Sequence, residues 1–126
     1  MLPEPNRLHR ARDFSVVMRR GRRMGRSDLV VHAVARGEQG IASTVHGPRF
    51  GLIVSKAVGP AVTRHRVARR LRHICTDVLG ELTETTDVVI RALPGAASAT
   101  SADLSIQLRS GLKKLGLLEA PKGPPS

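Results

Sequence analysis

Apolar residues recur at helical spacing in three stretches of this chain, and each stretch predicts a helix. The first covers residues 8–20 and ends at Gly21, with arginines in its favourable last turn. The second follows Gly59 and Pro60, which break the chain, and runs to about residue 79 or 80. Either Pro60 takes the first helical position or Thr63 caps a slightly later start, and the sequence leaves both open. The apolar stripe of this second helix consists of Val67, Leu71, Ile74, Cys75, Val78 and Leu82.

The third predicted helix opens at Thr100 or Ser101, with Asp103 in its first turn, and ends at Gly116. One of its sides is lined by Leu104, Leu108, Leu112 and Leu115. An amphipathic helix of this kind needs a surface on which to bury its leucines. We therefore expect all three helices to pack on a common sheet.

Short runs rich in β-branched residues predict three strands, at 29–35, 50–55 and 87–93. The first two are expected to be antiparallel neighbours joined by the polar loop 36–49, and the basic run 19–26 to be a flexible connection. The order of elements is then α-β-β-α-β-α, an α+β sandwich with helices on a small sheet. We expect one domain over residues 1–118 and a disordered tail, rich in Pro and Gly, over residues 119–126.

The second predicted helix carries five arginines within nine residues: Arg64, Arg66, Arg69, Arg70 and Arg72. Four of them, all but Arg64, spread with His65 and His73 over the side opposite the apolar stripe. Arginines near a helix start oppose the macrodipole by roughly 0.3 to 1 kcal/mol each. No acidic residue lies between Glu38 and Asp77 to neutralise them, as a merely solvated charged face would require. Guanidinium groups at helical intervals can bind successive phosphates, so the pattern favours contact with a nucleic acid.

The composition points to the same class of partner. The 126 residues include 21 Lys and Arg against 10 Asp and Glu, a formal charge of +11. A polyanion is therefore expected, with nucleic acid ahead of a membrane surface. No stretch reaches the roughly 20 apolar residues of a spanning helix, and the first residues lack the apolar core of a signal peptide, so a cytoplasmic protein is expected. With only two Phe and no Tyr or Trp, arginine must carry most of the recognition.

Recognisable catalytic constellations are missing from the sequence. Its five histidines form no metal-ligand pattern with Cys75, the only cysteine, which is expected to be a small buried hydrophobe. The carboxylates pair with no histidine at a catalytic spacing, and no P-loop is present. If phosphodiester chemistry takes place here, we expect a partner to supply the catalytic groups.

Four further positions have two interpretations each. Lys56 ends a predicted strand next to the arginine helix, and is either a surface lysine or a phosphate contact. Phe14 and Met18, four residues apart, could pack in the core or against an unpaired nucleotide. His32 is either an ordinary strand residue or a ring that stacks on a base.

Residues 54–72, VSKAVGPAVTRHRVARRLR, resemble the signature of the protein subunit of bacterial ribonuclease P. That family carries a strand ending in Ser-Lys, then Gly, Ala-Val and an arginine helix with the hallmark Arg-Asn-Arg. The pairs Arg7-Leu8 and Asp13-Phe14, together with Gly21, extend the resemblance, which covers roughly residues 6–116. It implies a ribosomal protein S5 domain 2-like sandwich with a left-handed β-α-β crossover, against the right-handed norm.

The resemblance implies a cofactor protein for a catalytic RNA that removes 5′ leaders from precursor tRNA. The RNA would hold the Mg²⁺ ions, the protein alone would be inactive, and one protein would bind each RNA. Lys56, Arg64, Arg66, Arg69 and Arg72 match family positions, and would face catalytic RNA or nearby leader phosphates. His65, in place of the hallmark asparagine, and the additional Arg70 complete the expected RNA contacts. The leader-binding cleft would include Phe14, Met18 and His32.

This chain departs from the family pattern at several of these positions. His65 replaces the hallmark asparagine, and Ala57 and Ala68 stand where basic residues are frequent. Met18 and His32 occupy positions that are often aromatic, so less base stacking is expected.

Two other functions compete with the one that the resemblance implies. The first is that of a ribosomal or other structural RNA-binding protein. The second is that of a stand-alone nuclease, which the lack of a catalytic cluster disfavours.

Overall fold

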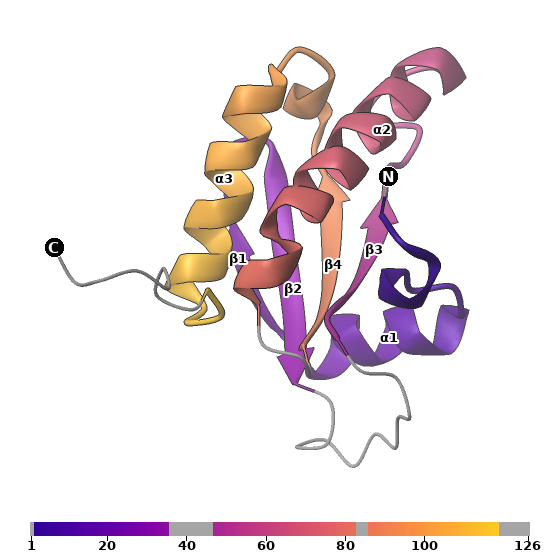
Figure 1. The fold of residues 1–126 in the computed structure, drawn as a ribbon. Helices are drawn as coiled ribbons and strands as arrows, with labels where there is room; N and C mark the ends of the chain where they lie inside the picture. Colours follow the sequence, from indigo (N-terminus) through magenta and orange to yellow (C-terminus); the bar gives the residue numbers. More distant parts are fainter. Residues whose placement is uncertain (1, 36–46, 83–85, 119–126) are drawn as a thin grey trace, which may run out of the picture.

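The sheet has four strands among the described residues, and the last strand in the sequence lies between the two that precede it. The computed structural model describes residues 2–35, 47–82 and 86–118 (Figure 1). Its strands are β1 (Arg22–Gly25), β2 (Leu29–Ala35), β3 (Arg49–Ile53) and β4 (Thr86–Ala92). Its α-helices are α1 (Ala11–Arg20), α2 (Ala61–Val78) and α3 (Ser101–Lys114), and the 3-10 helices are η1 (Glu4–Asn6), η2 (Leu79–Glu81) and η3 (Pro94–Ala97).

The central position of β4 corrects the predicted pairing. We expected β2 and β3 to be neighbours, but β4 is antiparallel to β2 and parallel to β3. Residues 86–90 of β4 are all buried. A strand with apolar residues on both faces is stable only inside a sheet that is covered on both sides. Burial of β4 therefore decides the order, and the proximity of β2 and β3 in the sequence does not.

The basic run after α1 is a strand and not the flexible connection that we expected. β1 pairs antiparallel with β2, from Arg22 opposite Ala33 to Gly25 opposite Val30. Met24 packs against the core, and Arg22 Nη2 donates a hydrogen bond of 2.6 Å to the carbonyl of Leu115. The order of elements is thus α-β-β-β-α-β-α. Prediction missed β1 because an exposed edge strand of arginines carries no β-branched apolar signal.

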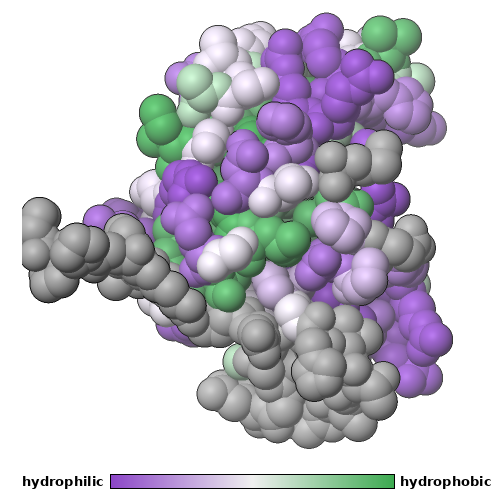
Figure 2. All heavy atoms as spheres, viewed as in Figure 1, coloured by the Kyte–Doolittle hydropathy of each residue, from purple (hydrophilic) through white to green (hydrophobic). Residues whose placement is uncertain are grey.

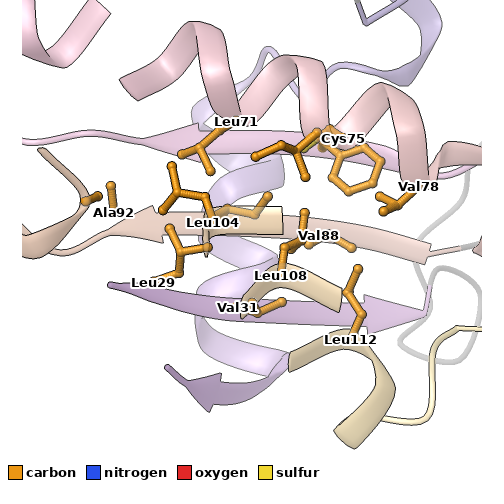
Figure 3. Close-up of a cluster of buried hydrophobic side chains, with 14 of the residues drawn as sticks. Leu29, Val31, Leu71, Cys75, Val78, Val88, Ala92, Leu104, Leu108 and Leu112 are labelled. Atoms are coloured by element: carbon orange, nitrogen blue, oxygen red, sulfur yellow. The ribbon is translucent and has the colours of Figure 1, made fainter. Parts of the chain in front are cut away.

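Helices α2 and α3 cover one face of the sheet, which we call the α2/α3 face (Figure 1). Strand residues at alternate positions point into this layer and interdigitate with the stripes that the sequence predicted for both helices (Figure 3). The largest fully buried side chains here include Leu29, Val31, Leu71, Val88, Ile90, Leu104, Leu108 and Leu112. This layer is the main hydrophobic core.

Helix α1 covers the opposite face, which we call the α1 face, with a smaller cluster. Leu8, Val17, Val34 and Val89 are buried there, and Phe14, Met18 and Ile53 pack against them. The helix begins at Ala11 and not at the predicted residue 8. The backbone N–H of Leu8 donates a 2.8 Å hydrogen bond to the carbonyl of Phe50, so the preceding segment pairs with β3 and cannot be helical.

The helix starts resolve the alternatives that the sequence left open. Thr100 caps α3 through a capping box: Asp103 N–H donates to Thr100 Oγ1 over 3.0 Å, and Thr100 N–H donates to Asp103 Oδ2 over 3.3 Å. Neither alternative for α2 is right, because Pro60 is the N-cap residue and its carbonyl accepts the N–H of Arg64. Gly116, with a φ of 75°, ends the α3 region as expected.

In the part of the chain that the structure describes, no helix has the length and apolar character needed to cross a membrane. Most of the predicted polar loop, residues 36–46, lies outside the described residues, as does the predicted tail 119–126.

Candidate nucleic-acid interface

The side of α2 that faces away from the sheet is cationic. Val67, Leu71, Ile74, Cys75 and Val78 turn inward, while His65, Arg66, Arg69, Arg72 and His73 are exposed. Hydrophilic surface accordingly gathers over α2 (Figure 2). The 100° advance of each residue thus separates the two sides as the sequence predicted.

Three of the arginines on α2 are anchored by backbone carbonyls. Arg66 Nη2 donates to Ala97 O over 3.0 Å, and Arg70 Nη1 donates to Ala99 O over 2.9 Å, beside η3. Arg64 Nε donates to Gly59 O over 3.2 Å at the start of the helix. A guanidinium group has five N–H donors, so each of these side chains is oriented and still has donors for a ligand.

Arg69 and Arg72 differ from the anchored arginines. Both are exposed, and neither makes a hydrogen bond or an ion pair within the described part of the chain. The same holds for His65, which replaces the asparagine of the family hallmark. The outward side of α2 therefore carries two kinds of arginine: some are oriented by hydrogen bonds to carbonyl groups, and others have no partner among the described residues.

Lys56 lies in a tight turn between β3 and α2 and is exposed. The N–H of Gly59 donates to the carbonyl of Lys56 over 3.1 Å, and Val58 N–H donates to Ser55 O over 3.1 Å. These bonds fix the turn that leads into α2. The lysine is thus held near the start of the arginine helix, where the sequence placed it.

The three residues predicted for a leader cleft lie on the α1 face. Phe14, Met18 and Ile53 each pack against the small cluster, and His32 belongs to the same face of β2 as Val34. The ring of Phe14 lies directly on Gly51, where an added Cβ would come within 2.5 Å of it. Phe14 and Met18 are half-buried, whereas His32 is only 4% exposed.

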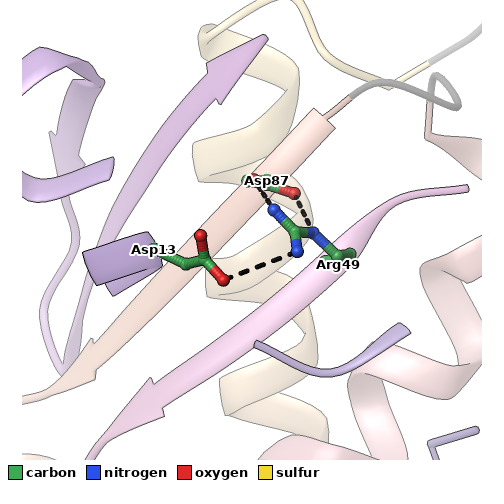
Figure 4. A network of polar contacts seen from close by, with 3 residues as sticks. All are labelled: Asp13, Arg49 and Asp87. Carbon is green, nitrogen blue, oxygen red and sulfur yellow. Dashed lines mark hydrogen bonds and ion pairs between the residues drawn. The ribbon is translucent and has the colours of Figure 1, made fainter. Parts of the chain in front are cut away.

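Sequence reasoning missed a charged network that fastens α1 to the sheet (Figure 4). Arg49 donates two hydrogen bonds to Asp87, from Nε over 2.9 Å and from Nη2 over 2.7 Å. Its Nη1 lies 3.6 Å from Asp13 Oδ2, on α1. The hydrogen bonds to Asp87 are the main cause that raises the pKa of Arg49. No local pattern signals this network, because Arg49 and Asp87 lie 38 positions apart in the sequence.

A second missed feature is the cationic surrounding of His32. Arg23 on β1 is its register partner, and Arg91 lies on β4. Burial, then Arg91, then Arg23 lower the pKa of His32, so its ring is kept neutral. His32 Nε2 and Arg91 Nε are both buried without a hydrogen-bond partner. They are the only such side-chain atoms among the described residues.

A hollow of about 250 Å³ at the β3 edge brings together residues that were predicted for two different surfaces. It contains Phe14 from the predicted leader cleft and Arg72 from the predicted RNA-docking helix. Met18 and His32 do not line it. The remaining lining residues are Leu2, Arg7, Leu8, His9, Phe50, Gly51 and Leu52.

Metal ligands are not grouped in the described residues: no three His, Cys, Asp or Glu side chains are placed to hold an ion. Cys75 is fully buried on α2, and burial raises the pKa of its thiol far above the usual range. It therefore acts as the core residue that the sequence predicted.

Comparison with known sequences gives one family. The family described as ribonuclease P matches residues 2–116. The chain is 70% identical over 119 residues to a ribonuclease P protein component of Rhodococcus erythropolis, covering 94% of both chains. It is 57% identical over 132 residues to that of Nocardia farcinica, covering 93% of this chain and 85% of the relative.

Solved structures give the same fold. A ribonuclease P protein of Staphylococcus aureus superposes with a TM-score of 0.76 at 21% identity, covering 90% of this chain and 98% of the other. The ribonuclease P protein of Thermotoga maritima superposes with a TM-score of 0.69 at 20% sequence identity, covering 82% of this chain and 92% of the other. The fold is thus shared at low identity.

Proposed function

The chain belongs to the bacterial ribonuclease P protein family, and from this premise we propose how its two faces divide the work of RNA binding. It is the protein component of ribonuclease P, an endoribonuclease of tRNA processing. In our proposal α2 docks on the catalytic RNA, and its side chains contact that RNA or nearby leader phosphates; the RNA-binding residues are Lys56, Arg64, His65, Arg66, Arg69, Arg70 and Arg72. The α1 face holds the 5′ leader of precursor tRNA.

The observation that carries the proposal is the uncompensated charge of α2. Arg69 and Arg72 have no partner in the described part of the chain, while Arg66 and Arg70 are oriented by backbone carbonyls. Such a surface binds phosphates with little rearrangement. Binding releases counterions, so the affinity for RNA falls steeply as salt increases.

The α1 face supports the leader assignment. Phe14, Met18 and His32 share that side of the sheet, and a single strand can stack on or pack against the half-buried Phe14 and Met18. The leader would thus run over the opposite side of the sheet from the core of α2 and α3.

We further propose that Mg²⁺ is held mainly by the RNA subunit, because phosphate oxygens are ligands that Mg²⁺ prefers and the described residues bring no three His, Cys, Asp or Glu side chains together to hold an ion. The protein alone is then inactive, and its arginines screen phosphate repulsion where RNA strands meet. We also propose that one protein molecule binds each RNA and that the complex is cytoplasmic.

The finer description of the fold also belongs to this proposal. β3 and β4 are parallel neighbours connected through α2, which covers one face of the sheet. This arrangement supports the left-handed β-α-β crossover of a ribosomal protein S5 domain 2-like fold. We further propose that the domain covers residues 1–118.

Reconstitution tests the proposed function. The protein is mixed with ribonuclease P RNA and precursor tRNA at low Mg²⁺, and cleavage is compared with that by each component alone. Activity from the mixture and none from the protein is expected. Cleavage by the protein alone would instead indicate a nuclease, and RNA binding without enhanced cleavage would indicate a structural RNA-binding protein.

A charge-matched pair of variants tests the role of α2. Arg66→Ala with Arg69→Ala should raise the Mg²⁺ needed for half-maximal cleavage and reduce the salt dependence of RNA binding by about two ions. Lys113→Ala with Lys114→Ala removes the same charge from exposed positions on α3. If both double variants shift the Mg²⁺ requirement equally, net charge and not the α2 surface is responsible.

A further inference from the structure

We infer that a hollow between α3 and the loop from β1 to β2 binds the sugar-phosphate backbone of a helix of the catalytic RNA. This contact is separate from the outward side of α2 and from the α1 face. The inference rests on the proposed function and extends it, because it gives a role to the basic run 19–26, which the contacts proposed above do not use.

The hollow has a volume of about 390 Å³ and carries a guanidinium, two hydroxyls and an amide. Arginine, serine and glutamine side chains are among those that bond to the phosphate and sugar oxygens of nucleic acids. The lining residues are Gly25, Arg26, Ser27, Ile106, Gln107 and Ser110.

Arg26 is oriented by hydrogen bonds that leave donors free. Its Nε donates to the carbonyl of Gly25 over 2.6 Å, and its Nη1 donates to Ser110 Oγ over 3.1 Å. A guanidinium group has five N–H donors, so others remain for a phosphate. Because the side chain is already held in place, less conformational entropy is lost on binding.

The nearest carboxylate does not neutralise this guanidinium. Asp28 follows Ser27 but does not line the hollow. Gln107 Nε2 donates to Asp28 Oδ2 over 2.7 Å, and Asp28 Oδ1 lies against Gly95. Within the described part of the chain Arg26 makes no ion pair, so its charge is open to an anion.

The cationic surface continues from the hollow along β1, at the edge of the sheet. Arg22 and Arg23 are exposed there, and Arg22 is held on α3 by its bond to the carbonyl of Leu115. Arg22 and Arg26 are four residues apart, roughly 13 Å in an extended strand, which spans several phosphates of one nucleic-acid strand. A track of this length fits a phosphate backbone better than a single small anion.

The lining favours an RNA helix over a single strand. The chain has no Tyr or Trp, and its two Phe residues line the hollow at the β3 edge and not this one. Proteins that bind single strands stack bases on aromatic side chains, whereas helical RNA is recognised through phosphates and 2′-hydroxyl groups.

The position of α3 favours the catalytic RNA as the source of that helix. α3 covers the β1 side of the sheet and α2 the β3 side, on the same face (Figure 1). Arg70 on α2 donates to the carbonyl of Ala99, directly before the N-cap residue of α3. An RNA that docks on α2 can therefore continue across α3 to the hollow, whereas the leader is proposed for the opposite face.

Site-directed crosslinking tests which RNA occupies the hollow. A Ser27→Cys protein is labelled with a thiol-directed photocrosslinker, for which Cys75, 0% exposed, does not compete. The matched control is Ser15→Cys, which alters an exposed serine on α1. In the holoenzyme with precursor tRNA, residue 27 should crosslink to a helical segment of the catalytic RNA that residue 15 does not reach. Crosslinks only to precursor tRNA, to an unpaired segment, to the same nucleotides as residue 15, or to no RNA overturn the inference.

Charge substitutions measure the contact in solution. Arg26→Gln should weaken binding of the catalytic RNA by about tenfold and lower the salt slope by about one, the loss of one phosphate contact. Arg12→Gln removes the same charge from an exposed position on α1 and should leave the slope unchanged. Equal effects of the two variants would show that net charge, and not the hollow, is responsible.

A second substitution excludes a folding defect, since Arg26 also ties the hairpin to α3. Ser27→Glu removes no hydrogen bond of the described residues and places a carboxylate where the RNA phosphate is expected. It should weaken RNA binding by about tenfold through like-charge repulsion, and Ser15→Glu should not. An unchanged affinity in Ser27→Glu overturns the inference.

The proposed function and this inference fail in different experiments. An inactive mixture of protein, catalytic RNA and precursor tRNA would refute the proposed function. An active mixture in which residue 27 does not crosslink to the catalytic RNA would refute only the site on α3.

Discussion

The two faces of the sheet differ in what they bury. The α2/α3 face is filled by leucine and valine side chains of β2, β4, α2 and α3 (Figure 3). The α1 face buries a smaller apolar cluster together with His32 and Asp87, and Arg49 ties Asp87 to α1 (Figure 4).

This difference separates stability from recognition within one small domain. Apolar packing is non-directional and roughly proportional to buried area, so the α2/α3 face stabilises the fold and leaves the outward side of α2 free for RNA. On the α1 face, the ion pair and hydrogen bonds that Arg49 makes with Asp13 and Asp87 hold α1 over the strands, and only a small apolar core lies beneath the helix. Arg49, Asp87 and Asp13 therefore stabilise the fold although they lie on the face that we propose for the leader.

Removal of Arg49 should have the largest effect on stability. Arg49→Ala leaves the buried Asp87 carboxylate without its bidentate partner, and a loss of about 3 to 5 kcal/mol in the free energy of unfolding is expected. Urea denaturation measures this loss. The matched control is Arg109→Ala, because the Arg109–Glu81 pair is 37% and 41% exposed and should contribute only about 0 to 1 kcal/mol. Equal losses in both variants would show that the α1 face does not depend on its charged network.

Gly51→Ala should displace α1 from the sheet. The added Cβ would meet the Phe14 ring at 2.5 Å, and overpacking of this kind costs about 1 to 3 kcal/mol. Phe14→Leu in the same chain relieves the contact, so the double variant should be more stable than Gly51→Ala alone. Additive losses would mean that the ring and the strand are not in contact in solution.

Stability should fall on acidification because of His32. Its folded-state pKa lies below the ordinary 6.5, so the unfolded state binds more protons as pH decreases through about 6.5. The free energy of unfolding therefore decreases below that pH and levels off once pH passes the folded-state pKa. Urea titrations between about pH 8 and pH 5 should show this slope, and His32→Gln should reduce it. Leu108→Ala, on the apolar face, should lower stability without changing the slope.

The smallest effect is expected in leader recognition. Met18 and His32 occupy positions that are often aromatic in the family, and stacking contributes about 1 to 3 kcal/mol per base where aromatics are present. Affinity for precursor tRNA should therefore vary little across leaders that differ at single positions. A panel of such leaders, with Met18→Phe as the comparison, measures the discrimination. Strong dependence on base identity in the native protein would contradict the prediction.

The three α-helices and strands β2, β3 and β4 could be predicted because each repeats a local pattern. The stripe Val67, Leu71 and Val78 is buried as expected, and Thr100 caps α3. β1 could not be predicted, since its arginines carry no strand signal and its place depends on pairing with β2 and on contacts with distant parts of the chain. Of the candidate site, the cationic side of α2 and the shared face of Phe14, Met18 and His32 could be inferred. The network at Arg49 could not, because it joins residues 38 positions apart.

The sequence by itself determined that the chain has an arginine helix with one apolar side, because helical periodicity is a local property of 3.6 residues per turn. It also determined the family, through the motif that precedes and forms that helix. Only the tertiary structure decided that β4 lies at the centre of the sheet, that Arg49 bonds to Asp87, and that Arg72 and Phe14 meet at the β3 edge. These outcomes depend on which elements bury one another, and burial is a property of the whole packed chain.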